Sequence, residues 1–252
     1  MARSVCLVCG NIATPYDCCD FMKNCQEVRG KFVPLSLKPV YYYRCAECGF
    51  VFSPELCSWT KQQFGNLIYN GDYVNFDPDF VEARPKLHAD IITAVFQGYR
   101  EHLKILDYGG GQGQMVSLLR NAGFNAVSYD PYYDEGSVPE HSDFDLVTAF
   151  EVFEHAAAPR RMMEEVAGFL GKESVFLFST VVSDGQILEN GRLTWWYASP
   201  RNGHISLYTT KSLRMLGACY GFEFHSFSQG MHAFFRELPD WARPAFYPVN
   251  PS

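Results

Sequence analysis

The sequence contains no apolar run that approaches the roughly 20 residues needed to cross a bilayer. Its first residues, MARSVCLVCG, also lack the apolar core of a secretory signal peptide. Long charged runs and low-complexity stretches are missing too, which argues against extended disorder. We therefore expect a folded, cytoplasmic protein without a membrane partner.

Positive charge is also scarce. The formal net charge is -7, and an acidic surface repels phosphate backbones. The first sixty residues carry six Lys or Arg against five Asp or Glu, so they have no marked excess of positive charge for binding nucleic acid. Nucleic acid is therefore not the expected partner.

Cysteine is almost absent from the last three quarters of the chain, where Cys219 is the single example. The other eight are Cys6, Cys9, Cys18, Cys19, Cys25, Cys45, Cys48 and Cys57. This asymmetry predicts an N-terminal module over residues 1–60 and a larger domain over residues 61–252. An odd count without an export signal favours metal binding over disulfides.

Two Cys-x-x-Cys pairs, each followed by glycine, carry the metal prediction. The predicted ligands are Cys6, Cys9, Cys45 and Cys48. Four thiolates close a tetrahedral zinc site and leave no position for substrate, so the zinc would be structural. Three further cysteines between the pairs leave the choice of ligands open, and a set of unmetallated buried thiols is the alternative.

Beyond the cysteine-rich module, apolar strand patterns alternate with amphipathic helix patterns. Expected strands cover residues 103–107, 126–129, 144–150, 174–180, 222–227 and 232–235, with helices over 82–98, 114–122, 160–170 and 210–220. In the first of these helices, Leu87, Ile91 and Val95 recur at a four-residue step, which is typical of a helix. This alternation predicts an α/β fold with a Rossmann-like, doubly wound, mostly parallel sheet.

A glycine loop follows the first of these strands. Residues 107–113 read Asp-Tyr-Gly-Gly-Gly-Gln-Gly and lead into a helix, an arrangement that lets a nucleoside cofactor approach the backbone. The spacing differs from the G-x-G-x-x-G fingerprint of dinucleotide sites. Asp107 is also badly placed for a pyrophosphate, whereas it suits a cofactor with a free ammonium group, such as S-adenosylmethionine.

These residues carry a family resemblance. Residues 105–113, and the run FDLVTAFEVFEH over 144–155, resemble two motifs of class I S-adenosylmethionine-dependent methyltransferases of type 11/23. The resemblance implies that the cofactor is bound by Asp107, Gly109, Gly111, Gly113, Asp130, Pro131, Phe150 and Glu151. Asp130 would hold the ribose, and Pro131 would border the adenine. Only about a dozen residues lie between Pro131 and Phe144, where the family has a third strand, so that strand is expected to be short or missing.

The segment around the second cysteine pair, Tyr-Arg-Cys-Ala-Glu-Cys-Gly-Phe over residues 43–50, resembles the zinc ribbon of a methyltransferase subgroup. Some members of that subgroup modify sugars. The resemblance implies a structural zinc that holds the module together and helps it cover the pocket.

An aromatic, Pro- and Gly-punctuated segment over residues 195–206 is the expected acceptor loop. His204 within it is the predicted catalytic base, because a neutral imidazole accepts a proton near pH 7. The resembling sugar methyltransferases also carry a histidine here, often after an acid, whereas Asn202 and Gly203 precede it in this chain. The alternative is a loop histidine that only bonds backbone.

The sequence thus predicts an enzyme that uses S-adenosylmethionine to methylate a small molecule, such as a nucleotide-linked sugar. Three alternatives stay open at this point. They are an RNA methyltransferase whose zinc module grips nucleic acid, a nicotinamide-dependent Rossmann oxidoreductase, and a non-catalytic zinc-ribbon binding protein.

Overall fold

The chain folds into two compact units, each built from separate stretches of sequence. The computed structural model describes residues 3–133, 139 and 144–247. Unit 1 comprises Met1–Asp79, Phe153–Met162 and Thr180–Leu216, and unit 2 comprises Phe80–Val152, Met163–Ser179 and Gly217–Ser252. Unit 1 therefore contains the cysteine-rich module together with later segments, and a separate domain over residues 1–60 stays a prediction. None of the described helices is long and apolar enough to cross a membrane.

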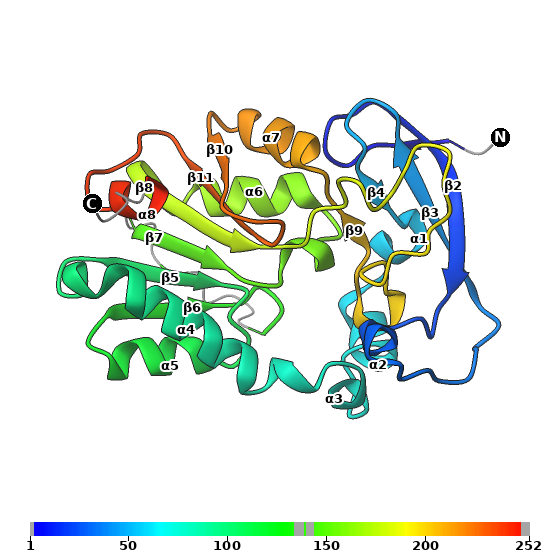
Figure 1. Cartoon of the computed structure of the whole chain (residues 1–252), viewed down its shortest axis with the longest axis horizontal. Helices are drawn as coiled ribbons and strands as arrows, with labels where there is room; N and C mark the ends of the chain where they lie inside the picture. The colour runs from blue at the N-terminus through cyan, green and yellow to red at the C-terminus, as the bar shows by residue number, and fades with distance from the viewer. Residues whose placement is uncertain (1–2, 134–138, 140–143, 248–252) are drawn as a thin grey trace, which may run out of the picture. The chain divides into compact units, whose positions relative to one another are not determined.

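Unit 1 is organised by a small antiparallel sheet in the order β1-β2-β3-β4-β9 (Figure 1). Its strands are β1 Ser4–Val5, β2 Ile12–Asp20, β3 Pro39–Cys45, β4 Val51–Phe52 and β9 Ser206–Leu207. The last strand comes from far along the chain and pairs with β4 through Val51 and Phe52. The sheet thus ties the end of the predicted acceptor loop to the cysteine-rich module.

Short helices connect these strands. Those within unit 1 are η1 Cys25–Arg29, α1 Pro54–Cys57, α2 Lys61–Leu67, α3 Tyr73–Phe76, η4 Phe153–His155 and η5 Pro200–Asn202. Their starts follow local chemistry: Thr60 accepts from the backbone N–H of Gln63, whose side chain accepts from the backbone N–H of Thr60. Three other helices cross a unit boundary, η2 Pro78–Phe80, α6 Pro159–Ala167 and α7 Thr210–Ala218.

Unit 2 is built on a mostly parallel sheet in the order β10-β11-β8-β7-β5-β6 (Figure 1). Its strands are β5 Lys104–Tyr108, β6 Asn125–Tyr129, β7 Phe144–Ala149, β8 Leu170–Ser179, β10 Glu223–Ser226 and β11 Met231–Phe235. Strands β8, β7, β5 and β6 run parallel, while β11 and β10 are antiparallel. The predicted α/β, Rossmann-like class is confirmed.

The expected shortening of the third strand falls largely on residues 134–138 and 140–143, which lie outside the described residues. Within the described part of the chain, β6 forms the edge of the sheet. Its neighbour β5 has β7 on the other side. The carboxyl ends of β5, β6 and β7 therefore share one edge of the sheet, where open α/β folds bind cofactors.

The helices of unit 2 are α4 Ala83–Phe96, η3 Gln97–Tyr99, α5 Gln114–Asn121 and α8 Arg243–Phe246. Helices α4 and α5 cover one face of the sheet (Figure 1), with Ile92 and Leu119 in its apolar core. The helix expected over residues 82–98 is present as α4, in which Leu87 and Val95 are exposed. The buried row lies one position further along the chain, at His88, Ile92 and Phe96.

Candidate functional site

The glycine loop lies between β5 and α5 in unit 2. Its backbone turns through Gly109 at φ 74°, Gly111 at φ 55° and Gly113 at φ 74°, all in the left-handed region that favours glycine. A Cβ on Gly111 would meet no atom within 4 Å, so this residue borders open space. The loop therefore presents bare backbone at the edge where the strands end.

Asp107 lies beneath this loop. Its side chain is buried, and Thr148 Oγ1 donates to its Oδ1 at 2.9 Å. A Cβ on Gly110 would collide with the Asp107 carboxylate and with Ser128 Oγ, so the loop packs directly onto both side chains. Burial raises the pKa of Asp107 to about 7, and the neighbouring Asp130 adds to the rise.

Asp130 holds the loop from the end of β6. Its Oδ2 accepts the backbone N–H of Gly111 at 2.9 Å, and its Oδ1 accepts the backbone N–H of Tyr132 at 2.7 Å. Pro131, between them, is half-buried. Each carboxylate oxygen has a second lone pair, so this side chain still has acceptor capacity for hydroxyl donors.

The end of β7 carries a strained residue, because Glu151 has a φ of 57° without being glycine. Ser179 at the end of β8 secures it: its Oγ donates to Glu151 Oε1 at 2.9 Å and accepts the Glu151 N–H at 2.8 Å. Arg84 of α4 approaches Glu151 Oε2 at 3.7 Å. The carboxylate is thus fixed in place beside a cation.

Phe150, the residue before it, stacks on His88 of α4 with ring centroids 4.1 Å apart and an interplanar angle of 24°. Burial and the nearby Arg84 lower the pKa of His88 to about 4, so its ring is neutral at pH 7. Helix α4 therefore contributes both a cation and a flat neutral ring to this edge.

All the predicted cofactor residues that belong to the sheet lie at the carboxyl ends of β5, β6 and β7. Four supporting side chains were not predicted from the sequence: Arg84, His88, Thr148 and Ser179. Thr148 had a visible signal, a polar residue within the apolar run of β7, where it pairs with Asp107 across the parallel ladder. Arg84 and His88 of α4 had no such signal, because their contacts with Glu151 and Phe150 join residues far apart in the sequence.

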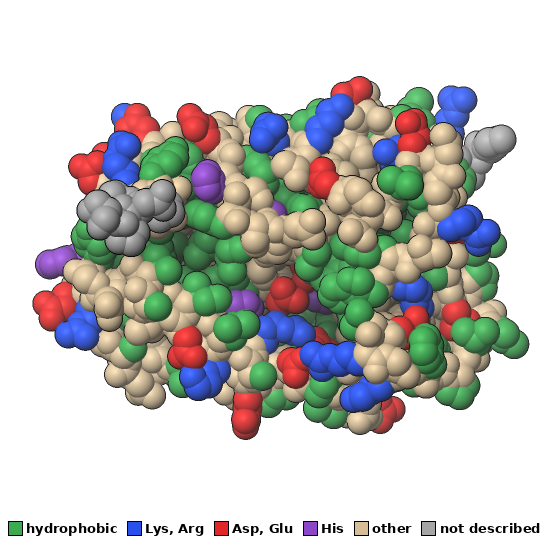
Figure 2. Space-filling model, viewed as in Figure 1, with side chains coloured by type: hydrophobic (Ala, Val, Ile, Leu, Met, Phe, Trp, Pro, Cys, Tyr) green, Lys and Arg blue, Asp and Glu red, His purple; other side chains and the backbone are tan. Residues whose placement is uncertain are grey.

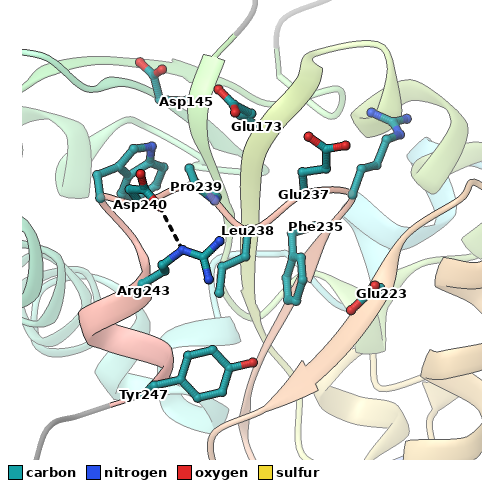
Figure 3. Close-up of a pocket in the computed structure, with 12 residues that line it drawn as sticks. Asp145, Glu173, Glu223, Phe235, Glu237, Leu238, Pro239, Asp240, Arg243 and Tyr247 are labelled. Atoms are coloured by element: carbon teal, nitrogen blue, oxygen red, sulfur yellow. Dashed lines mark hydrogen bonds and ion pairs between the residues drawn. The ribbon is translucent and has the colours of Figure 1, made fainter.

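A large cavity of about 740 Å³ also opens in unit 2, but no predicted cofactor residue lines it (Figure 3). Asp145 and Glu173 border it near the amino ends of β7 and β8, the edge opposite the glycine loop. Five carboxylates and two arginines line it, and Arg243 pairs with Asp240 at 2.9 Å. It is therefore separate from the candidate cofactor edge.

In unit 1, the four predicted cysteine ligands meet. All four sulfur atoms lie within 4.8 Å of one another, with Cys6 Sγ 3.6 Å from Cys48 Sγ and Cys9 Sγ 3.5 Å from Cys45 Sγ. Two equivalent turns place them, since the backbone N–H groups of Gly10 and Gly49 donate to the carbonyls of Cys6 and Cys45. A compact set of four thiols fits the tetrahedral geometry of zinc.

The other described cysteines lie elsewhere, and none is in a disulfide. Cys18 is exposed on β2, and Cys19 is half-buried. The Sγ atom of Cys25 lies 3.8 Å from His204 Nδ1.

His204 is buried in unit 1 and lies near two residues of η4, the buried Glu154 and the half-buried His155. One ligand atom each from Glu154, His155 and His204 lie within 4.8 Å of one another. Glu154 is fully buried, and the two imidazole centroids are 5.1 Å apart. The sequence predicted only the last of these three residues.

The loop that carries His204 is fixed by the cysteine-rich module. Lys23 Nζ donates to the carbonyls of Trp195 at 2.7 Å and Ala198 at 2.8 Å. The Tyr42 hydroxyl donates to the carbonyl of His204 at 2.7 Å. The long loop is therefore held at both ends by unit 1.

The comparisons with known proteins agree with this fold. The family described as "Methyltransferase domain" matches residues 80–226, more than half of the chain. Similar solved structures include the plantazolicin methyltransferase BpumL in complex with SAH, with 14% identity, a TM-score of 0.48, and coverage of 72% of this chain and 94% of that chain. Another is an O-methyltransferase family protein from Burkholderia thailandensis, with 13% identity, a TM-score of 0.49, and coverage of 74% and 67%.

A third is the magnesium protoporphyrin IX methyltransferase from Synechocystis PCC 6803 with bound SAH, with 14% identity, a TM-score of 0.42, and coverage of 69% and 95%. No curated protein matches the chain by sequence. Because the family match spans the glycine loop and the whole parallel part of the sheet, the chain belongs to the methyltransferase-domain family and is an S-adenosylmethionine-dependent methyltransferase.

Proposed function

We propose that this methyltransferase transfers the methyl group of S-adenosylmethionine to a small-molecule acceptor, such as a nucleotide-linked sugar. The observation that carries the proposal is the edge of unit 2 where bare glycine backbone meets carboxylates from three neighbouring strands. The sulfonium is already activated, so the protein's main task is to position the acceptor.

In this proposal the methionyl part of the cofactor lies over Gly109, Gly111 and Gly113. Asp107 supports the loop from below and provides negative charge for the ammonium group. Asp130 holds the ribose hydroxyls and Pro131 borders the adenine. Contacts with Gly111 and Tyr132 already orient Asp130 for that task.

Phe150 and Glu151 complete the cofactor seat at the end of β7. The left-handed backbone of Glu151 supports this assignment, because strained residues cluster at ligand sites. Arg84 beside Glu151 adds a cation that suits the cofactor's carboxylate.

We place His204 at the acceptor, as the sequence predicts. Its Nδ1 lies 2.8 Å from the carbonyl of Tyr197, which can only accept, so Nδ1 carries the hydrogen and Nε2 carries the lone pair. A lone pair held in a fixed direction supports a role on the acceptor's proton.

We assign the four clustered cysteines to a structural zinc. Cys6, Cys9, Cys45 and Cys48 would hold the ion, which would cross-link β1, β3 and the turns that follow them. Because Lys23 and Tyr42 of the same unit hold the acceptor loop, the metal would also stabilise the surroundings of His204.

The two enzymatic alternatives are weaker. Membership of the methyltransferase family removes the nicotinamide oxidoreductase. An RNA substrate would need a basic surface, whereas acidic and basic side chains are interspersed among the described residues on the face shown in Figure 2. The net charge of -7 points the same way.

The proposal is tested by substituting the glycine that borders open space. Gly111→Val would place a branched side chain where the cofactor should lie, and would strain a left-handed backbone. Gly71→Val is the matched control, because that glycine also faces open space but has no left-handed φ. In calorimetric titration with S-adenosylhomocysteine, we expect affinity to fall more than tenfold for the first variant only. Equal affinity in both variants would refute the assignment of the loop.

A further inference from the structure

We propose that Glu154, His155 and His204 form a second metal site, which binds a divalent first-row transition-metal ion and presents it to an oxygen of the methyl acceptor. The inference rests on the proposed methyl transfer for its role, although not for its existence. It is distinct from the four-cysteine cluster, which is closed to substrate.

The two imidazoles are oriented as metal ligands usually are. His155 Nδ1 lies 3.0 Å from the carbonyl of Gly203, and His204 Nδ1 lies 2.8 Å from the carbonyl of Tyr197. A carbonyl only accepts, so both rings carry their hydrogen on Nδ1 and a lone pair on Nε2. A backbone carbonyl behind the ring fixes the tautomer and strengthens the other nitrogen as a ligand.

The two segments that carry these side chains are locked together. The N–H of Ile205 donates to the carbonyl of Glu154 at 2.9 Å, and Ser206 Oγ donates to the carbonyl of Ala156 at 2.7 Å. The Tyr208 hydroxyl donates to the carbonyl of Phe153 at 3.1 Å. The three candidate ligands are therefore held in a rigid arrangement before any ion binds.

Charge and burial point the same way. Glu154 is fully buried and His204 is 5% exposed, with their ligand atoms within 4.8 Å of one another and of His155. In such a low-dielectric surrounding, a carboxylate attracts a cation more strongly than it does in water. A divalent ion would draw the three donors together around itself.

The donor set determines the class of ion. Two imidazoles and one carboxylate suit Zn²⁺, Mn²⁺ or Fe²⁺, whereas four thiolates select softer ions. Three protein ligands leave at least one coordination position open, which is the arrangement of catalytic rather than structural sites. Unit 1 thus contains a four-cysteine cluster that would have no coordination position left for substrate, and a cluster around His204 that would keep one.

The open position gives His204 a more specific role than that of a base. The ion would take a hydroxyl oxygen of the acceptor as a ligand and lower its pKa, so that the proton leaves to water.

The test uses Mn²⁺ and the purified full-length chain, and needs no knowledge of the acceptor. Free Mn²⁺ gives an electron paramagnetic resonance signal that is lost on binding, and Mn²⁺ has little affinity for thiolates. We expect about one bound Mn²⁺ per chain, which Zn²⁺ displaces. Glu154→Gln and His155→Gln should each weaken binding more than tenfold, whereas Glu55→Gln, an exposed acid of the same unit, should leave it unchanged.

Circular dichroism and calorimetric titration with S-adenosylhomocysteine accompany each variant, and both should match the wild type. If S-adenosylhomocysteine binds but wild-type chain leaves the Mn²⁺ signal intact, the metal site is refuted and the proposed function survives. The metal site is also refuted if Glu154→Gln and His155→Gln both bind Mn²⁺ as tightly as the wild type does. If Mn²⁺ binds but S-adenosylhomocysteine does not, the cofactor assignment fails while the metal site stands.

Discussion

If Asp107 faces the cofactor as proposed, cofactor binding should depend on pH in a direction set by its raised pKa. Its pKa is raised to about 7 by burial beneath the glycine loop, so the side chain is half protonated at neutral pH before the cofactor binds. The cofactor's ammonium group favours the ionised carboxylate. Binding below pH 7 must therefore release a proton from Asp107.

The size of the expected pH effect on cofactor binding follows from the pKa of Asp107. Asp107 is about 90% protonated at pH 6, about 50% at pH 7 and about 10% at pH 8. Calorimetric titration with S-adenosylhomocysteine, in two buffers of different ionisation enthalpy, should report the corresponding number of protons released. Affinity should weaken about fivefold between pH 7 and pH 6, since the ionised fraction falls by that factor.

Asp107→Asn should abolish this pH dependence and weaken binding most at pH 8, where the wild-type carboxylate is charged. Asp90→Asn, an exposed acid of the same unit, should behave as the wild type. A wild-type affinity that stays constant from pH 6 to pH 8 without proton release would refute the role of Asp107. An Asp107→Asn variant whose affinity depends on pH as the wild type does would also refute this role.

The raised pKa of Asp107 also predicts how the stability of the cofactor-free chain depends on pH. The folded chain holds this proton more tightly than the unfolded chain, whose pKa lies near 3.8. The contribution of Asp107 to stability is therefore present below that value and is lost as pH rises to about 7. Asp107→Asn should raise the Tm at pH 8, and the gain should shrink as pH falls; a gain that grows at low pH would contradict this.

Three further expectations concern the scaffold. Ile92→Ala, which opens a cavity under α4, should cost about 2–5 kcal/mol of unfolding free energy, whereas exposed Leu87→Ala should stay within about 0.5 kcal/mol, as measured in urea titrations. Equal losses would contradict the observed face of α4. We expect elemental analysis to find about one zinc per chain in the wild type and none in Cys45→Ser, and zinc retained in the variant would remove the ligand assignment. Lys23→Met should speed amide hydrogen exchange at residues 195–204, because two loop carbonyls lose their donor; unchanged exchange would show that Lys23 does not hold the loop.

The sequence predicted the architecture of unit 2 because its signals are local. Each parallel strand is a short apolar run, and the glycine loop is a contiguous motif whose left-handed residues can be only glycine without strain. The order β7-β5-β6 then follows from the connectivity of such folds. Periodicity predicted α4 as a helix but did not reveal its buried face, because Leu87 is exposed whereas the adjacent His88 is buried.

Unit 1 was harder to predict from sequence. Strand β2, Ile12–Asp20, contains a proline, two aspartates and an irregularity in pairing between Pro15 and Asp17, so no alternating pattern marks it. Strand β9 has only two residues and gains its partner β4 from far along the chain. Such long-range pairing leaves no local signal.

The cluster around His204 shows the same contrast. The loop histidine was visible as a polar residue in an aromatic segment. Glu154 and His155 were assigned only to a strand motif, because their proximity to His204 depends on hydrogen bonds that join residues about fifty positions apart. The four cysteines lie together as their repeated spacing led us to expect, and their role as metal ligands stays a prediction.

The central claim is that unit 2 binds an adenosyl sulfonium at the carboxyl ends of β5, β6 and β7. Equilibrium dialysis of the purified chain with radiolabelled S-adenosylmethionine tests it most directly. We predict about one bound cofactor per chain at micromolar concentrations, within the usual range for enzyme ligands. A chain that retains no label at millimolar concentrations would contradict the account.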